Sequence, residues 1–429
     1  MSLAQRRLLY ILIIVVFLGM GAASLQFATG HRFDLRSRQF VKVGAVYIKS
    51  YPSGASVLLN GKPTGKKTPA RLLNIVPGEQ TVTVVREGFA SWEKKLAMPS
   101  GETVFIRDIV LFRSNPRSTR LSQGGAAVLK YDDQDAFLFI DNIGKIHLTF
   151  TAGPADFVIE TPSRPEALLA LSADGGRIAY RTPKGSFIID VNTESVNTIP
   201  LAPGAKVVRA QWDPTASGVL WLLTDAGNLS RFDQNLGELK DAAVNIHDFR
   251  AAADRIFILT LDGDRVLVQS KSGTDEPRTI ASLTNENPPT ISAALANGSL
   301  LLSNGSTFWI IDGNRVEVRS LDALSADVHG SLVLLASEFE IVLFDTDTWT
   351  ETLLDRSSQP IQRIAWHTSG SYFLRQQEGL VELVEIDGRD RRNTVPLLIT
   401  SATSTLALDR KGSRLFVVTP DASIYSVIQ

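Results

Sequence analysis

A cassette that recurs eight times between Ala136 and Val418 constrains the fold of this chain more than any other feature. Each copy has a loop with Asp, Gly or Asn, an apolar strand, a polar turn and a second strand. The first strands start roughly 40 residues apart on average, which is the period of four-stranded propeller blades. We predict these first strands at Phe137–Ile140, Arg177–Tyr180, Leu220–Leu223, Arg255–Leu259, Ser299–Leu302, Ser331–Leu335, Ser371–Leu374 and Arg414–Val418.

Such a unit cannot bury both faces of its sheet alone, so the units must stack around a common axis. The repeat predicts a β-propeller with eight blades, or with seven if the unit at Phe137 or at Ser299 is degenerate. The last unit reaches Gln429 after three strands. Because a ring needs its ends fastened, we expect Arg117–Ser122 to supply the missing strand of the final blade. A propeller is a binding surface and is not by itself evidence of a reaction.

The bulk composition is that of a folded protein with more than one domain. At 429 residues the chain predicts two or three domains, and 44% hydrophobic with 21% charged residues argues against extensive disorder. There is no cysteine, which excludes disulfides, thiolate catalysis and cysteine metal sites.

The net charge of −1 is unevenly distributed along the chain. Residues 31–113 hold 14 Lys+Arg and 6 Asp+Glu, whereas residues 114–429 hold 28 and 39. A basic segment beside an acidic repeat domain favours a position near an anionic surface such as lipid headgroups or wall polymer. Ordinary surface solvation is the alternative explanation.

The N-terminus carries a candidate membrane anchor. Arg6 and Arg7 precede Leu8–Ala28, an uncharged run of about 21 residues that is long enough to cross a hydrocarbon core of roughly 30 Å. The alternative is a cleavable signal peptide, for which Gly21-Ala22-Ala23 offers small residues. We predict a cytoplasmic tip and signal anchor over residues 1–30, with the bilayer contacted through Leu8 to Ala28. Residues 31–43 are expected to be a tether, and everything after the helix is expected to lie outside.

A small β domain is predicted over residues 44–113. Val46 and Ile48 alternate with polar residues, as half-buried strands do. Asn60-Gly61 is a type I′ hairpin signal, because both central residues of that turn need positive φ. Pro77-Gly78 and Ser100-Gly101 mark further turns, which leaves six or seven strands, enough for a small sandwich.

The turn residues of this segment resemble the PEGA domain family. The matching residues, in order, are Tyr51-Pro52-Ser53-Gly54-Ala55, Val57, Asn60-Gly61, Gly65, Thr68-Pro69, Pro77-Gly78, Val82, Val84, Gly88-Phe89 and Trp92. Ser53 stands where the name-giving Glu would be, and Phe89 replaces the commoner Tyr. The resemblance implies a non-catalytic β module of bacterial and archaeal envelope proteins, and it brings no catalytic residues.

The repeat domain, residues 114–429, resembles the superfamily of WD-type and Tol-system-type propellers. Its clearest copy is Leu171–Tyr180, a strand, an Asp174-Gly175 turn and a second strand. The resemblance is limited to the repeat, since the Trp-Asp dipeptide of WD repeats does not recur.

Candidate chemistry is sparse. The five histidines, at 31, 147, 247, 329 and 367, include no pair at metal-ligand spacing, and no catalytic Gly-x-Ser-x-Gly, phosphate-loop or His-Glu-x-x-His motif occurs. The acidic pairs Asp262/Asp264 and Asp345/Asp347 lack the closing Glu of a calcium loop, so we interpret them as turn residues. Five tryptophans of the repeat domain fit blade cores or, for one or two of them, a glycan-binding mouth: Trp212, Trp221, Trp309, Trp349 and Trp366.

We therefore expect a non-enzymatic, single-pass protein of the plasma membrane, with most of the chain extracytoplasmic. Its propeller is expected to bind a protein or a cell-wall polymer, with no catalytic residue, cofactor, metal or nucleic-acid partner. The alternative is an extracytoplasmic propeller enzyme, either a glycosidase or a quinoprotein-like dehydrogenase. A glycosidase would need two carboxylates about 5–10 Å apart in the central funnel.

Overall fold

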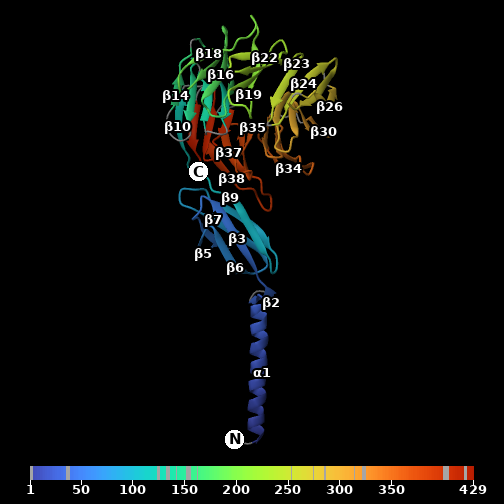
Figure 1. The fold of residues 1–429 in the computed structure, drawn as a ribbon. Coiled ribbons are helices and arrows are strands. Elements are labelled where there is room, and N and C mark those ends of the chain that lie inside the picture. The colour runs from blue at the N-terminus through green and yellow to red at the C-terminus, as the bar shows by residue number, and fades with distance from the viewer. Residues whose placement is uncertain are drawn as a thin grey trace. The chain divides into compact units, whose positions relative to one another are not determined.

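A computed structural model describes residues 3–34, 39–122, 126–131, 136–141, 143–150, 156–161, 163–252, 254–273, 275–284, 287–313, 315–320, 325–399, 405–419 and 423–429. The chain forms two compact units (Figure 1). Unit 1 comprises Met1–Asn115 together with Asp387–Asn393, and unit 2 comprises Pro116–Ile386 with Thr394–Gln429. The fold is mainly β, as the sequence predicts.

The predicted apolar segment is a helix. Helix α1 runs over Leu3–Ala28, and its stretch Leu9–Ala28 is long and apolar enough to cross a membrane. The large apolar side chains of this stretch are exposed, as Phe17 is, with 72% of its surface accessible. The helix therefore has the length and composition of an anchor or of a signal sequence.

The segment after α1 contains a short hairpin, which the sequence pattern does not predict. Strands β1 (His31–Asp34) and β2 (Gln39–Lys42) pair antiparallel. The rings of Phe33 and Phe40 meet edge to face with their centroids 5.3 Å apart. An aromatic pair directly across two strands stabilises such a ribbon.

Residues 44–110 of unit 1 form a seven-stranded sandwich of two sheets, ordered β6-β3-β9 and β5-β4-β7-β8. The strands are β3 (Gly44–Tyr51), β4 (Ser56–Leu59), β5 (Lys62–Lys67), β6 (Ala70–Ile75), β7 (Gly78–Val85), β8 (Trp92–Met98) and β9 (Thr103–Val110). Alternate residues of β3 and β8 point into one core, where Val46, Ile48 and Trp92 are buried. Asn60 and Gly61 both have positive φ, 51° and 74°, which confirms the predicted hairpin turn.

Strand β8 is an edge strand of its sheet, and Asp387–Asn393 covers its outer side within unit 1. The Asn393 side-chain amide exchanges two hydrogen bonds with the backbone of Glu93, and Asp390 accepts a bond from the Lys95 amide at 2.8 Å. Lys94 is fully buried and lies 3.3 Å from the Asp387 carboxylate. These side chains satisfy an edge that would otherwise present unpaired backbone groups. The sequence pattern does not predict this insertion.

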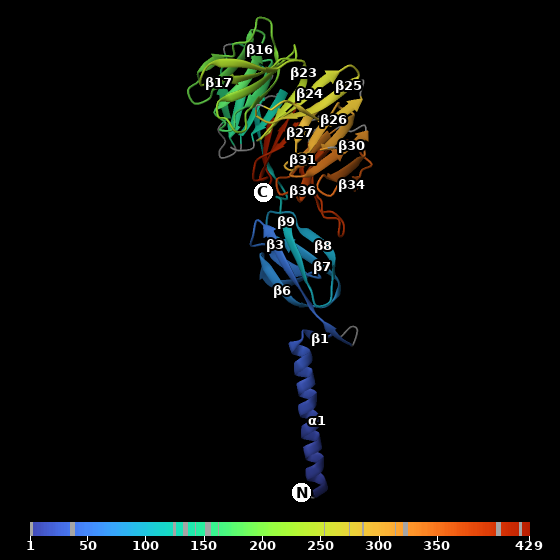
Figure 2. The same cartoon turned by 45° about the vertical axis from the view of Figure 1, so that its right-hand side comes forward.

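In the described part of the chain, unit 2 holds eight four-stranded sheets, which confirms eight blades (Figure 2). The first four sheets are β11 (Ala126–Tyr131), β12 (Ala136–Ile140), β13 (Ile146–Phe150), β14 (Asp156–Ile159); β15 (Ala167–Leu171), β16 (Arg177–Thr182), β17 (Gly185–Asp190), β18 (Val196–Thr198); β19 (Val207–Trp212), β20 (Val219–Thr224), β21 (Leu229–Asp233), β22 (Glu238–Ala243); and β23 (Ile246–Ala251), β24 (Ile256–Asp262), β25 (Arg265–Lys271), β26 (Arg278–Thr284).

The other four sheets follow in chain order, and the last of them takes one strand from the start of unit 2. They are β27 (Thr290–Ala294), β28 (Leu300–Ser303), β29 (Thr307–Asp312), β30 (Arg315–Ser320); β31 (Ser325–His329), β32 (Leu332–Ala336), β33 (Glu340–Asp345), β34 (Thr350–Arg356); β35 (Ile361–Trp366), β36 (Tyr372–Gln377), β37 (Leu380–Glu385), β38 (Thr394–Leu398); and β39 (Thr405–Leu408), β40 (Arg414–Val418), β41 (Ser423–Val427), β10 (Arg117–Ser122).

The apolar strands that mark the repeat in the sequence are the second strand of each sheet. Strand β16, for example, pairs with β15 on one side and β17 on the other. A second strand is hydrogen-bonded at both edges and covered on both faces, and it therefore has the most continuous apolar sequence. The first strands contact those of neighbouring sheets, as β15 contacts β19 and β31 contacts β35, and they line the axis.

The ring closes where the sequence predicts. Strand β10, Arg117–Ser122, pairs antiparallel with β41 and completes the last sheet. The rings of Phe137 on β12 and Phe416 on β40 stack with centroids 3.6 Å apart, so the first sheet packs on the last. Both ends of the propeller are thus fastened in one sheet.

Removing residues 424–429 should therefore disrupt the propeller and not merely shorten it. The deletion takes most of β41 away from between β10 and β40, and it exposes two strand edges with the core beneath them. We expect aggregation or loss of cooperative thermal unfolding, measured by circular dichroism and light scattering. Deleting residues 31–42 is the control and should leave the unfolding of unit 2 unchanged. A truncated chain as stable as the full one would contradict closure through β10.

Candidate functional site

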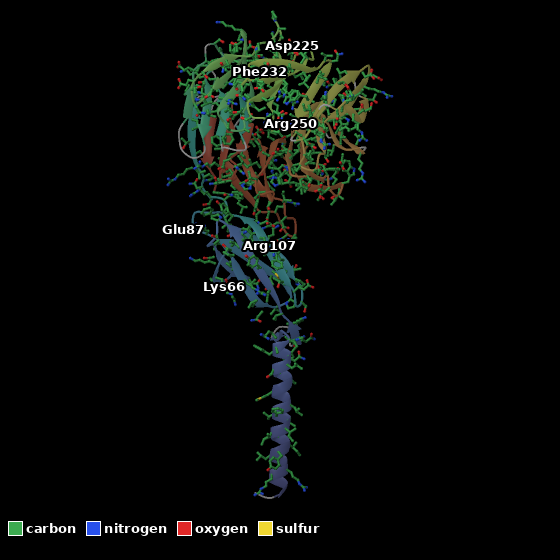
Figure 3. All side chains as sticks on the ribbon, in the orientation of Figure 1. Lys66, Glu87, Arg107, Asp225, Phe232 and Arg250 are labelled. Atoms are coloured by element: carbon green, nitrogen blue, oxygen red, sulfur yellow. The ribbon has the colours of Figure 1, made fainter. Side chains whose placement is uncertain are left out.

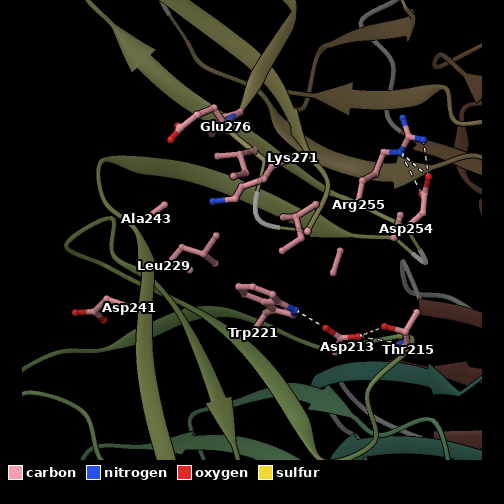
Figure 4. A pocket seen from close by; sticks show the side chains of 17 residues that line it. Asp213, Thr215, Trp221, Leu229, Asp241, Ala243, Asp254, Arg255, Lys271 and Glu276 are labelled. Carbon is pink, nitrogen blue, oxygen red and sulfur yellow. Dashed lines mark hydrogen bonds and ion pairs between the residues drawn. The ribbon is translucent and has the colours of Figure 1, made fainter.

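Unit 2 contains a groove of about 810 Å³ between the sheet of β19–β22 and the sheet of β23–β26 (Figure 4). We call it the interblade groove. Its floor is apolar, formed by Leu229 and Ile258, which are buried, and by the half-buried Trp221 and Ile256. A concave site with an apolar floor is the usual form of a ligand or peptide pocket.

Small side chains line the groove where these two sheets meet. Ala242 and Ala243 end β22, and Ala251 and Ala252 lie where β23 ends, all four lining the groove. The apolar cluster of this interface has five buried residues, against ten and eleven in the clusters on its two sides. The two alanine pairs are the sequence signal for this groove, which the repeat pattern does not reveal.

The rim of the groove carries charges of both signs. Asp254 and Arg255 form an exposed ion pair (Figure 4). Lys271 is the last residue of β25, and Glu276 lies in the loop that follows it. The groove therefore offers apolar contact at the bottom and polar contacts of either charge above it.

Asp213 fixes the indole that forms the floor. Its Oδ2 accepts a hydrogen bond from Trp221 Nε1 at 3.0 Å, while its Oδ1 accepts bonds from Thr215 and Ala216. Burial opposes the ionised form, but the bonds from Thr215 and Trp221 outweigh it, and the pKa of Asp213 lies below its usual range. The carboxylate thus stays charged and holds the ring in place.

Side chains of the first strands fasten neighbouring sheets to one another. The Gln211 amide exchanges bonds of 2.8 and 2.9 Å with the backbone of Ala251 on the next sheet. Two carboxylates of the first strands also join neighbouring sheets. Asp248 accepts a hydrogen bond from the Ile291 backbone amide, and Asp327 accepts one from the Trp366 backbone amide. Both first-strand carboxylates are thus bonded to the backbone of the following sheet, a structural role different from that of a glycosidase acid and base.

The other notable feature of unit 2 is a charged cluster on two first strands, β19 and β23, which bonds to the backbone of a third, β27. Arg209 on β19 donates to both oxygens of Asp248 on β23, with the Oδ1 contact at 2.6 Å, and to the Ile291 carbonyl on β27 at 2.9 Å. Only 3% of the Asp248 side chain is exposed. Arg250 follows on the same face of β23, where burial and the charge of Arg209 lower its pKa, against the effect of Asp248.

Three histidines contact neighbouring groups of unit 2, whereas the buried Nε2 of His247 has no hydrogen-bond partner among the described residues. His147 Nε2 lies 3.0 Å from Asp141, and the His329 ring packs against Trp366. His367 Nε2 lies 3.0 Å from the Gly412 carbonyl of the next sheet, while its Nδ1 accepts the Ser369 amide, so the neutral ring donates to Gly412. Within the described residues no group of His, Asp and Glu is arranged to hold a metal ion.

The structure also gives the surroundings of the acidic pair Asp345/Asp347 and of the tryptophans. Asp345 accepts the backbone amides of Asp347 and Thr348, as turn carboxylates do. Trp212, Trp309 and Trp366 are buried, whereas Trp349 is half-buried and packs on Phe344. Among these tryptophans Trp221 alone lines the interblade groove.

Comparison with known proteins assigns the small β domain. Residues 43–111 match the PEGA domain family. This segment is a PEGA domain. The matched residues cover the sandwich formed by β3 to β9, and they include the turn residues that resemble the PEGA domain family.

Solved structures identify the fold of unit 2. The C-terminal WD40 domain of Sif2 is 12% identical with a TM-score of 0.55, and the match covers 73% of this chain and 99% of that one. Sqt1 from Saccharomyces cerevisiae is 10% identical with a TM-score of 0.53, covering 73% and 98%. BamB from Moraxella catarrhalis is 15% identical, covers 73% and 96%, and has a TM-score of 0.49. No curated protein matches the chain. The likenesses to Sif2 and Sqt1 establish the propeller fold.

Replacing Arg209 by Met should destabilise unit 2 by about 3–5 kcal/mol, because it leaves the buried Asp248 charge without its partner. The measurement is urea unfolding of the wild type, R209M, D248N and the double variant. We expect the double variant to lose less than the two single losses combined, since it contains no unpaired charge. Additive losses, or a loss below about 1 kcal/mol for R209M, would contradict a coupled buried pair.

Acid should destabilise unit 2 through His367. Burial lowers the pKa of His367 to about 4, the Gly412 carbonyl opposes this, and the charge of His329 adds to it. The unfolded chain takes up this proton near pH 6.5, so it binds more protons than the folded chain between pH 6.5 and 4. The free energy of unfolding should fall across that window by on the order of 3 kcal/mol.

The matched test measures unfolding by urea at pH 7.0 and pH 5.0 for the wild type, H367N and H31N. His31 lies in the β1 hairpin and serves as the control. H367N should be less stable at pH 7.0, because it loses the bond to Gly412, and it should depend less on pH. An unchanged slope in H367N would show that other groups cause the acid sensitivity.

Proposed function

We propose that this chain is a non-enzymatic, single-pass protein of the cell envelope whose propeller binds a protein partner outside the plasma membrane. The interblade groove carries the proposal. Its apolar floor and mixed-charge rim suit a polypeptide, which brings apolar side chains and charges of both signs, better than they suit an uncharged glycan.

The membrane part of the proposal is supported by α1. The stretch Leu9–Ala28 spans about 30 Å as a helix, which matches the hydrocarbon core of a bilayer. Arg6 and Arg7 favour a cytoplasmic N-terminus, with the PEGA domain and the propeller exported.

The non-enzymatic part is supported by the roles of the first-strand carboxylates. Asp248 and Asp327 each accept a backbone amide of the next sheet, and Asp248 also binds Arg209. A carboxylate held in this way is poorly suited to act as a general acid or as a nucleophile. Protein binding through a rigid groove requires no such group.

Photo-crosslinking in intact cells tests the proposal. A benzophenone amino acid would replace Ala242, which is exposed at the groove, or Ala202, which is exposed between β18 and β19 and serves as the control. We expect a discrete protein adduct from position 242 alone, which is lost when A252F fills the groove. An adduct that muramidase shortens would indicate a wall polymer instead. Equal labelling at both positions would remove the support for the groove.

Protease added to spheroplasts tests the topology. The proposal expects degradation of the propeller and retention of a membrane-bound fragment that contains α1. A propeller that is protected until the membrane is lysed would contradict the extracytoplasmic placement. So would a mature chain that starts at Ser24 and is released in soluble form.

A further inference from the structure

The guanidinium of Arg250 is a charged group of unit 2 that the packing of the sheets does not explain. It is half-buried on β23, whose neighbours on the axis are β19 and β27 (Figure 3). Among the described residues it forms no hydrogen bond and no ion pair shorter than 4 Å. A guanidinium is always charged and presents five N–H donors, so those that no protein acceptor takes are open to a ligand from solvent.

The nearby carboxylate is already satisfied. Asp248 lies two residues before Arg250 on the same face of β23, but both of its oxygens accept from Arg209 and one also accepts the Ile291 amide. Two guanidiniums and one carboxylate leave a net charge of +1 in this cluster. Arg209 is held by Asp248 and by the Ile291 carbonyl, so its position is fixed.

This arrangement has the properties of an oxyanion site. One arginine is fixed as part of the wall, and the second has free donors and is accessible from solvent through its exposed part. The surplus charge lies on first strands, whose free edges face the axis of a propeller that is otherwise acidic. A planar guanidinium matches the two oxygens of a carboxylate or a phosphate.

We propose that Arg250 binds an oxyanion, a carboxylate or a phosphate, at the axis of the propeller. Arg209 and Asp248 form the wall of the site and do not contact the bound oxyanion. The inference is independent of the proposed function, because it concerns the axis and not the interblade groove.

Isothermal titration calorimetry of the full chain in detergent tests the site with two probes, inorganic phosphate and an acetylated Gly-Glu-Gly amide peptide. The variants are R250Q, R250K and R265Q, the last removing an equal charge from the exposed part of β25 in the same sheet. Thermal unfolding of each variant confirms that it is folded.

Binding of either probe that falls at least tenfold in R250Q, less in R250K, and not in R265Q supports the proposal. The probe that binds identifies the source of the oxyanion. The proposal is overturned if neither probe binds to the wild type at millimolar concentration. It is equally overturned if R250Q and R265Q weaken binding to the same extent, since the effect would then reflect net charge alone. Loss of crosslinking at the groove would leave these results unaffected.

Discussion

The structure of unit 2 depends on the fact that a four-stranded sheet cannot bury its two faces by itself. Apolar clusters span the six successive interfaces from the first sheet to the seventh, and a further cluster joins the last sheet to the first. A linear stack would leave two faces in water, so the ends must meet. The stacked rings of Phe137 and Phe416, and the strand that β10 lends to the last sheet, meet this requirement.

Closure also determines which residues are left for function. Gln211, Asp248 and Asp327 lie on the first strands β19, β23 and β31, and each bonds to the backbone of the next first strand. These polar side chains at the axis thus hold neighbouring sheets together, although their position alone would make them candidates for catalysis. Arg250 differs from them, because its charged side chain makes no hydrogen bond to any described residue of a neighbouring sheet. A polar residue at the axis is therefore informative only after its bonds to the neighbouring sheet are known.

The sequence predicts the parts of this molecule that local chemistry determines. The Asn60-Gly61 turn, the blade period and the closing strand Arg117–Ser122 all follow from backbone preferences or from counting strands, and the structure has each of them. The sequence does not give the rank of the repeated strand within its sheet, because a run of apolar residues indicates burial and not strand order. The insertion of Asp387–Asn393 could not be predicted, since its bonds to Glu93 and Lys95 join residues about 300 apart in the chain.

The candidate sites were the least predictable, for a physical reason. The interblade groove is lined by two pairs of alanines at an interface whose apolar cluster is smaller than those on its two sides. Alanine by itself is compatible with many environments, so the sequence does not reveal the groove. The axial site arises from an arginine whose neighbours are satisfied elsewhere, which only the set of contacts can reveal. In a repeat protein most positions are constrained to be alike, because every blade must fit its neighbours. Departures from that likeness, whether an under-filled interface or a surplus charge, are where we expect binding to have been added to the fold.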